Sequence, residues 1–256
     1  MTTGVRQTGD FCWINVMTSD PVGAREFFSK VLGWTYGDMG GMGDLIQVGG
    51  KTMGAMFDIN GPNSPPNVRP VVAPMVRVDS ADAIVEKANS LGGSAKPAFD
   101  IMDNGRMAEP ADPTGAKLDV WQPIKQQGAE HDPAHHGGTT WFELLTTDVD
   151  KSVEFYKNLF GWTSKVMSMP GMDYTTFAHN GSDIAGAMKI GPEMGPMPSN
   201  WGTYFTVDDA DAAAKTAEEL GAQIFVPPTD IPGIGRFSAM ASPQGVMFSV
   251  VKYLPR

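Results

Sequence analysis

Hydrophobic and polar residues alternate over short stretches of this chain, and each stretch leads into a segment with helical periodicity. Residues 10–18 alternate, which predicts a strand with Ile14 and Val16 facing a core. Apolar residues with a 3.6-residue period follow Asp20 and stop at Gly33, which predicts a helix. Asp20 is suited to cap its N-terminus and Gly33 its C-terminus. Short strands separated by glycines then complete the unit.

The same unit recurs in the second half. Asp148 and Gly161 lie 128 positions after Asp20 and Gly33, within a chain of 256 residues. Each half also contains a second strand–helix pair, which begins near Val71 in the first half and at 201 in the second. The pattern therefore predicts an α+β protein of βαβββ units produced by internal duplication. We expect one domain over 1–126, a polar linker over 127–138 and a second domain over 139–256.

The composition narrows the possible partners. A net charge of −10 disfavours nucleic acids and acidic membrane surfaces. Cys12 is the only cysteine, which fits a reducing compartment, and no apolar run reaches membrane length. We expect a cytoplasmic protein with a small-molecule ligand. Because the duplication puts two copies of the unit in one chain, we expect a monomer, with a homodimer as the alternative.

The order of these motifs resembles the glyoxalase/bleomycin-resistance/dioxygenase family, the vicinal-oxygen-chelate proteins. The residues that carry the resemblance are Asp20, Phe27-Phe28, Gly33, Asp112-Pro113-Thr114-Gly115, Asp148, Phe155-Tyr156, Gly161 and Ser242-Pro243-Gln244-Gly245. The resemblance implies four βαβββ modules paired into two glyoxalase-like half-barrel domains, each with a cleft on its curved sheet.

Metal-dependent members of this family present His or Glu from the cleft face of the first and last strands of each module. The corresponding positions here hold Trp13, Met56, Ala73, Asp119, Trp141, Met188, Gly202 and Ser249. Only Asp119 offers a carboxylate, whereas a catalytic divalent metal needs about three protein ligands. We therefore expect no metal and no other cofactor in either half.

The alternation places aromatic and methionine side chains with few polar groups on the predicted cleft faces. The candidates for ligand binding are Trp13, Asn15, Met75, Arg77, Trp121, Trp141, Tyr204, Thr206, Met247 and Ser249. Such a lining is typical of a small-molecule pocket, so we expect an apolar or aromatic ligand. The alternative is that the tryptophans only fill the space of a lost metal.

Glu143 and Asp119 are the candidate catalytic residues. If Glu143 points into an apolar cleft beside Trp141, burial would raise its pKa and suit it to general acid–base chemistry. The equivalent Asn15 is neutral and cannot act in this way. The chain could then be a lyase, isomerase or hydroxylase-like enzyme acting on a small or polyketide-like substrate. Alternatively, Glu143 is a structural carboxylate paired with a basic neighbour such as Arg236.

Other polar residues have simpler interpretations. Arg106 and Arg236 each follow a glycine in equivalent turns, where they could anchor an anion or hold the turn together. Arg77 is another possible substrate anchor. His131, His135 and His136 lie in the linker, and we expect them on a solvated surface. Cys12 is expected to be a small core residue.

Overall fold

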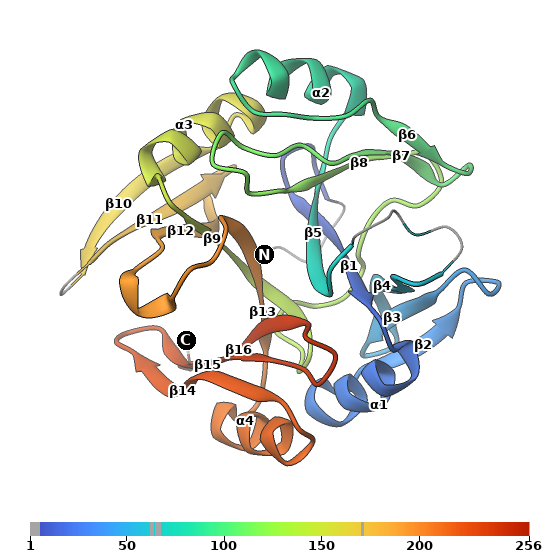
Figure 1. Ribbon diagram of the computed structural model, residues 1–256, viewed down its shortest axis with the longest axis vertical. Helices are drawn as coiled ribbons and strands as arrows, with labels where there is room; N and C mark the ends of the chain where they lie inside the picture. Colours follow the sequence, from blue (N-terminus) through green and yellow to red (C-terminus); the bar gives the residue numbers. More distant parts are fainter. Residues whose placement is uncertain (1–5, 62–63, 65–67, 170–171, 256) are drawn as a thin grey trace.

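The computed structural model describes residues 6–61, 64, 68–169 and 172–255. Within these residues the chain forms two eight-stranded sheets with two α-helices beside each (Figure 1). None of the described helices has the length and apolar character needed to cross a bilayer.

The first half of the chain makes one of these sheets. Its strands, in spatial order, are β2 (Thr35–Asp38), β3 (Asp44–Val48), β4 (Lys51–Asp58), β1 (Phe11–Thr18), β5 (Val71–Arg77), β8 (Asp119–Pro123), β7 (Gly105–Ala108) and β6 (Phe99–Ile101). Its helices are α1 (Pro21–Leu32) and α2 (Ala81–Ser90).

The second half repeats this arrangement. Its strands, in spatial order, are β10 (Thr163–Met169), β11 (Met172–His179), β12 (Ser182–Lys189), β9 (Thr139–Thr146), β13 (Asn200–Thr206), β16 (Met247–Tyr253), β15 (Gly235–Ala241) and β14 (Gln223–Ile231). Its helices are α3 (Val149–Phe160) and α4 (Ala210–Glu219), and a 3₁₀ turn covers Pro192–Met194.

The strand pairing confirms four βαβββ modules joined into two half-barrel domains. Within each module the first and last strands are parallel, as in β1 with β4 and β9 with β12. Two modules join through their antiparallel first strands, β1 with β5 and β9 with β13. The first join lies within the first half of the chain, and the second join lies within the second half.

The predicted helix ends are confirmed. The Asp20 carboxylate accepts a hydrogen bond from the Gly23 amide, and that of Asp148 accepts one from the Lys151 amide. Gly33 ends α1 in the left-handed conformation with φ of 65°. Because the cap replaces hydrogen bonds that the first helical turn lacks, each helix begins directly after its strand.

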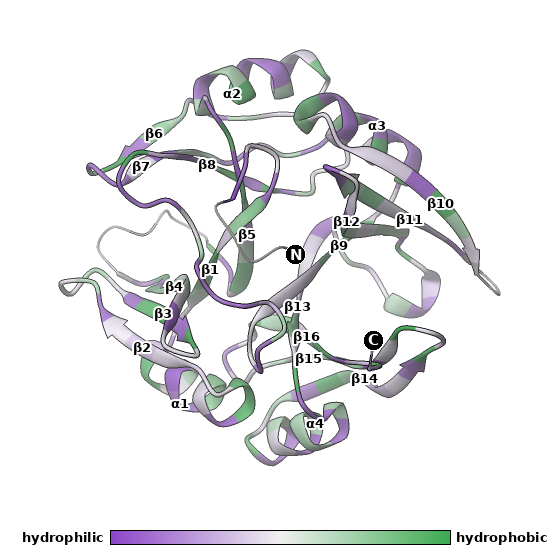
Figure 2. Ribbon diagram, turned by 180° about the vertical axis from the view of Figure 1, so that it is seen from behind, coloured by the Kyte–Doolittle hydropathy of each residue, from purple (hydrophilic) through white to green (hydrophobic). Residues whose placement is uncertain are grey.

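The hydrophobic core is shared by both halves of the chain. The rings of Phe11 and Phe142 stack with centroids 3.8 Å apart, which joins β1 to β9. The Trp34 and Trp162 indoles each donate across the halves, to the carbonyls of Gly137 and Gly9, both at 2.8 Å. Helices pair across the halves as well, α1 with α4 and α2 with α3 (Figure 1). These helices alternate between hydrophilic and hydrophobic stretches (Figure 2), as expected when one face covers a core.

The expectation of a solvated histidine run in the linker is wrong for His131. Its side chain is buried, and its Nε2 lies 2.9 Å from the Thr139 hydroxyl. Burial lowers its pKa to about 4, so the ring is neutral. The linker also forms backbone hydrogen bonds with the first sheet, from Ala129 to Cys12 and from Glu130 to Thr52. The linker is therefore a packed part of the fold, which its polar composition did not predict.

Candidate ligand-binding site

The face of each sheet turned away from the helices is called here its cleft face. In β9 the side chains of Phe142 and Leu144 are buried in the shared core, whereas those of Trp141 and Glu143 are half-buried. In β1, Ile14 is buried in the core and Trp13 is half-buried. Alternation therefore assigned these strand faces correctly.

Pairing of β9, β13 and β16 places three candidates in one row of the second sheet. Tyr204 lies beside Trp141 on one side and Ser249 on the other. Glu143 lies in the next row, between Gly186 of β12 and Gly202 of β13. Neither neighbouring residue has a side chain, and the space above Gly186 is occupied by the Tyr174 phenol.

Two tyrosines bind the Glu143 carboxylate. The Tyr174 hydroxyl donates to Oε1 at 2.8 Å, and the Tyr204 hydroxyl donates to Oε2 at 2.6 Å. The Trp141 indole donates to the Tyr174 oxygen at 3.0 Å. Ser249 forms a side-chain hydrogen bond with Tyr204. One chain of donors from Trp141 through Tyr174 and another from Ser249 through Tyr204 therefore converge on one carboxylate. These five residues are called the Glu143 network, namely Trp141, Glu143, Tyr174, Tyr204 and Ser249.

Gly186 makes this arrangement possible. A Cβ atom at this position would lie 1.8 Å from the Tyr174 hydroxyl oxygen. Any larger residue would push the phenol away from Glu143. At Gly202 the closest atom to an added Cβ would be the Glu143 carbonyl oxygen, at an ordinary distance of 3.7 Å.

Burial and hydrogen bonding act on Glu143 in opposite directions. Burial raises the pKa of its carboxyl, and the hydrogen bonds from Tyr204 and Tyr174 lower it, with burial the larger effect. The pKa values of both phenols lie well above normal, first because of burial and then because of the nearby Glu143 charge. The phenols therefore remain protonated donors at neutral pH.

The first sheet differs at the equivalent positions. Its row consists of Trp13, Met75 and Asp119 on β1, β5 and β8. The Trp13 indole donates directly to the Asn15 side chain at 3.1 Å, and the Asn15 amide lies 3.6 Å from the Met75 sulfur. Asn15 thus takes the place of Glu143, without phenol donors.

The cleft face of the first sheet is largely filled by its own side chains. Met75, Met107 and Trp121 are buried together with Cys12, and Trp13 packs against them. In the second sheet Trp141, Tyr204 and Phe237 are only partly buried, and Met247 is 51% exposed. The second sheet therefore offers the more accessible aromatic surface.

Asp119 is a buried carboxyl in the filled cleft face. Burial raises its pKa to about 8, the negative charge of Glu109 adds to this effect, and Lys117 opposes it. Its exposed fraction is 9%. An acid held in this way is suited to exchanging protons near neutral pH.

Three further ligand-binding candidates form hydrogen bonds with the linker or with the residue directly before it. The Arg77 guanidinium donates to the Gln127 carbonyl at 3.0 Å, and the Trp121 indole donates to the Gln126 carbonyl at 2.9 Å. The Thr206 hydroxyl donates to the Pro133 carbonyl at 2.8 Å. The side chains of Arg77 and Thr206 thus bind the linker, and that of Trp121 binds the residue directly before it. Their part in ligand binding stays a prediction.

The repeated arginines form ion pairs within their own domains. Arg236 binds Asp211 and Asp230, and Arg106 binds Asp82 and Asp100. Each pair of contacts joins a helix to the edge strands of its sheet. This supports the structural interpretation, and it shows that the basic neighbour expected for Glu143 is engaged elsewhere. Cys12 is buried, as expected, but it packs with Met75 and Trp121 on the cleft face of the first sheet and not in the shared core.

The donor groups on the cleft faces do not fit the metal that the family implies. The rows contain Trp13, Met75 and Asp119 in one sheet and Trp141, Tyr204 and Ser249 in the other. Ala73 and Gly202 lie one row further along, beside Asn15 and Glu143. No group of three or more His, Cys, Asp or Glu side chains gathers anywhere in the described parts of the chain. Neither row has the three oxygen or nitrogen ligands that a catalytic metal requires.

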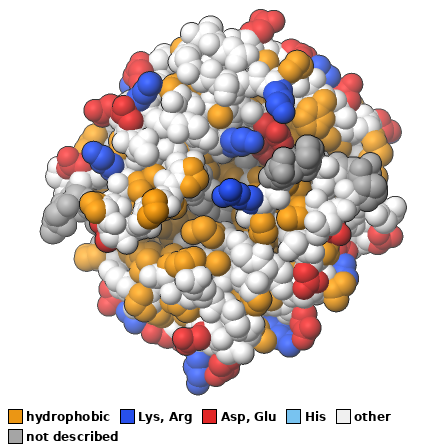
Figure 3. Space-filling model, viewed as in Figure 1, with side chains coloured by type: hydrophobic (Ala, Val, Ile, Leu, Met, Phe, Trp, Pro, Cys, Tyr) orange, Lys and Arg blue, Asp and Glu red, His pale blue; other side chains and the backbone are white. Residues whose placement is uncertain are grey.

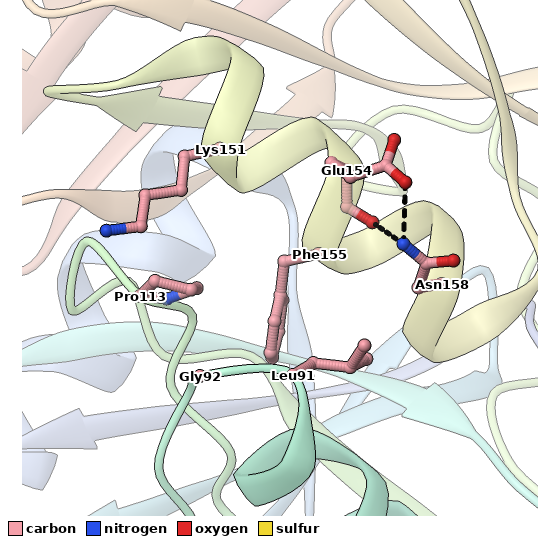
Figure 4. A pocket seen from close by; sticks show the side chains of 7 residues that line it. All are labelled: Leu91, Gly92, Pro113, Lys151, Glu154, Phe155 and Asn158. Atoms are coloured by element: carbon pink, nitrogen blue, oxygen red, sulfur yellow. Dashed lines mark hydrogen bonds between the residues drawn. The ribbon is translucent and has the colours of Figure 1, made fainter.

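A separate pocket of about 380 Å³ lies between the halves of the chain (Figure 4). Leu91, Gly92 and Pro113 line it from the first half, and α3 contributes Lys151, Glu154, Phe155 and Asn158. Glu154 and Asn158 bind each other there. The pocket contains none of the cleft-face candidates, so we do not place the function there.

Exposed apolar side chains gather around the second sheet. Figure 3 shows them beside a hollow in the part of the molecule where β14–β16 lie in Figure 1. Exposed residues from this domain include Met194, Phe225, Met247, Tyr253 and Leu254. A hollow rimmed by apolar groups is a typical setting for an apolar ligand.

The residue pattern did not identify Tyr174 or Phe237 as site residues. Tyr174 lies on β11, 31 residues from Glu143, and Phe237 on β15 lies 6.2 Å from Tyr204 between ring centroids. The available signal for Tyr174 was a tyrosine on β11 combined with a glycine, Gly186, on the adjacent strand β12, where a large side chain has room. Using this signal requires the pairing of β11 with β12, which local periodicity does not reveal.

Comparison with known sequences gives consistent results. The profile of the Glyoxalase/Bleomycin resistance protein/Dioxygenase superfamily matches residues 138–250. A protein of Mycobacterium tuberculosis named "Putative glyoxylase CFP32" is 36% identical over 252 residues, which is 95% of each chain. The "Anthracycline biosynthesis protein DnrV" of Streptomyces peucetius is 39% identical over 127 residues, covering 44% of this chain and 46% of that protein.

Solved structures share the fold. A Mn(II)-bound glyoxalase from Novosphingobium aromaticivorans aligns with a TM-score of 0.64 and 16% identity, covering 97% of this chain and 83% of the other. A catechol 2,3-dioxygenase aligns with the same TM-score and 12% identity, covering 97% and 90%. At these identities the likeness concerns the fold alone.

Proposed function

Since the chain belongs to the glyoxalase/bleomycin resistance protein/dioxygenase superfamily, we propose that it binds an aromatic or apolar small molecule on the cleft face of its second sheet, without a metal. The observation that carries this proposal is the Glu143 network, a hydrogen-bonded carboxylate on an accessible aromatic surface. The aromatic rings supply contact area, and the carboxylate and phenols orient a polar group of the ligand.

The contrast between the two sheets supports this choice of site. Asp119 and Met75 are buried in the first cleft face, whereas Trp141 and Tyr204 keep exposed surface in the second. A ligand can contact the second sheet without displacing a packed cluster. The first sheet would then mainly contribute to the shared core.

Ligand titration combined with metal analysis tests the proposal. Protein purified from a metal-replete medium should contain no stoichiometric zinc, iron, nickel or manganese. It should bind aromatic compounds such as naphthalene derivatives, with quenching of tryptophan fluorescence. Trp141→Ala should weaken binding about tenfold, the effect of one lost aromatic contact, and Trp13→Ala should change it less. Retention of a stoichiometric metal, or the reverse order of the two variants, would contradict the proposal.

A second candidate function is general acid–base catalysis on the bound molecule. The carboxyls of Glu143 and Asp119 favour it, because burial raises the pKa of both, to about 8 for Asp119, and a buried carboxyl with a raised pKa is suited to proton transfer. The similarity to an anthracycline biosynthesis protein is consistent with a polyketide-like substrate. The enzyme would then be a lyase, an isomerase or hydroxylase-like.

Proton exchange distinguishes the two candidates. An acid–base enzyme should accelerate deuterium uptake at the α-carbon of an aromatic ketone such as tetralone, measured by NMR in D₂O. Glu143→Gln should abolish the acceleration while the ketone still binds. Full exchange activity in this variant would exclude Glu143 as the base and leave Asp119 for the same test.

A further inference from the structure

Glu143 is a carboxyl group with no ion pair to a cationic side chain among the described residues. Its contacts are the hydroxyls of Tyr174 and Tyr204, and no Lys, Arg or His side chain of the described chain forms an ion pair with it. Arg236, a basic residue of the same domain, is bound to Asp211 and Asp230. A carboxylate that is partly removed from water normally has a cation or a metal beside it, because removing its charge from water is costly.

Glu143 only accepts hydrogen bonds from its neighbours, and it has room to accept more. Trp141 donates to Tyr174, and both tyrosines donate to the carboxylate. An ionised carboxylate has about four lone-pair positions, and these two bonds occupy one on each oxygen. The remaining positions can accept hydrogen bonds from a ligand.

Aromatic rings surround this carboxylate on the same face of the sheet. Trp141, Tyr174 and Tyr204 belong to the network, and the Phe237 ring lies 6.2 Å from that of Tyr204 at an interplanar angle of 35°. The faces of aromatic rings attract cations, most strongly weakly hydrated organic ammonium ions. A carboxylate among several aromatic rings is a combination that recognises such ions.

We infer that the second sheet selects ligands carrying an organic ammonium group, which pairs with Glu143 while an aromatic or apolar body rests on the surrounding rings. This inference rests on the proposed function and adds the chemical class of the ligand. A metal ion does not suit the site, since one carboxylate among aromatic rings lacks the ligands that a metal requires. The protein's net charge of −10 further favours the approach of cations.

The first sheet provides an internal comparison. Asn15 occupies the position of Glu143 and carries no charge, and its side chain is bound by Trp13 and lies against Met75. Ammonium selection should therefore belong to the second sheet. The buried Asp119 is the other carboxyl to test, because it also has no ion pair among the described residues.

Matched probes test the inference. Naphthalen-1-ylmethylamine, which is cationic at neutral pH, is compared with naphthalene-1-methanol, a neutral molecule of nearly the same shape. Dissociation constants are measured by calorimetry on the full-length protein at pH 7.5. The amine should bind at least tenfold more tightly than the alcohol. Glu143→Gln should remove this preference while the alcohol still binds, and Glu154→Gln, on the exposed face of α3, should retain it.

The outcomes separate this inference from the proposed function. Equal binding of both probes, or tighter binding of the alcohol, would overturn ammonium selection and leave aromatic binding intact. Binding of neither probe would contradict both. Loss of the preference in Asp119→Asn but not in Glu143→Gln would overturn the assignment to the second sheet. The preference should also weaken as the pH is lowered, because protonation removes the charge of Glu143, whereas alcohol binding should stay constant.

Discussion

At the scale of single residues, the absence of a side chain at Gly186 is as important as the presence of Glu143. The Tyr174 phenol occupies the space that a Cβ at Gly186 would need, and from there it reaches Oε1 of Glu143. The first sheet has Ala55 beside Asn15 at this point. A methyl group at position 186 would therefore take the place of the Tyr174 hydroxyl.

Gly186→Ala should displace the Tyr174 hydroxyl and break its hydrogen bond to Glu143. Since a hydrogen bond to a charged group contributes about 1.5–3 kcal/mol, we expect affinity for the amine probe to fall about tenfold. Calorimetric titration measures the change. Gly202→Ala is the matched control, because its added Cβ meets only an atom 3.7 Å away. Equal losses in the two variants would show that contact with Tyr174 is not the cause.

Asp119 should make the protein less stable as the pH rises. Its pKa is about 8 in the folded protein, above the ordinary value of 3.8. The folded state therefore holds the proton more tightly, and stability is lost between about pH 4 and pH 8 as the unfolded state releases it. Asp119→Asn should raise the melting temperature by several degrees at pH 8 and have little effect at pH 4.

Thermal melts across this pH range measure the effect. Asp103→Asn is the control, because the exposed Asp103 pairs with Lys125 and its pKa is lowered. A melting-temperature difference between Asp119→Asn and the parent protein that does not change with pH would contradict the burial of an ionisable group at this position.

At the scale of elements, each module begins with a strand that leads into a capped helix. In β9 one face contributes Phe142 to the core and the other contributes Glu143 to the site. The Asp148 cap starts α3 two residues after this strand. Changes to the cap should therefore affect the stability of the module while leaving the chemistry of the cleft face unchanged.

Asp148→Ala should destabilise the protein by about 1 kcal/mol, the usual value of an N-cap. For a chain of this size the melting temperature should fall by about 2–4 °C, as measured by circular dichroism. Asp150→Ala, within the exposed first turn of α3, should have a smaller effect. If both variants lost the same stability, the general charge near the helix and not the capping bond would be responsible.

At the scale of the whole molecule, the two halves share one core but offer two different faces to ligands. Phe11 and Phe142 stack across the halves, and indoles from each half bind the backbone of the other. The first cleft face is filled and the second is accessible. The second sheet can therefore contact a ligand, while the side chains of the first sheet mainly pack against each other.

The shared core should make the protein unfold in a single cooperative transition. Phe142→Ala removes a buried ring and should cost about 3–5 kcal/mol. Differential scanning calorimetry should show one peak that moves to lower temperature without splitting. Phe225→Ala, at a ring that is 47% exposed, should change stability by less than about 0.5 kcal/mol. Two separate peaks in the parent protein would contradict a shared core.

The sequence predicted most of the fold because its signals are local. Caps such as Asp20, stops such as Gly33 and the alternation around Trp141 and Glu143 depend on residues a few positions apart. The repeat then extended these local assignments over the whole chain. The burial of His131 was missed, since its contact with Thr139 depends on how the linker packs between the sheets.

The sequence by itself determined the modules, their duplication and the two faces of β9. Only the tertiary structure decided that Tyr174 and Tyr204 meet at Glu143, that the first cleft face is filled, and that Arg236 binds its own aspartates. The physical reason is that periodicity follows from backbone geometry within one element. The contacts of Glu143 instead depend on the register between strands 31 and 61 residues apart, which is set only when the sheets assemble.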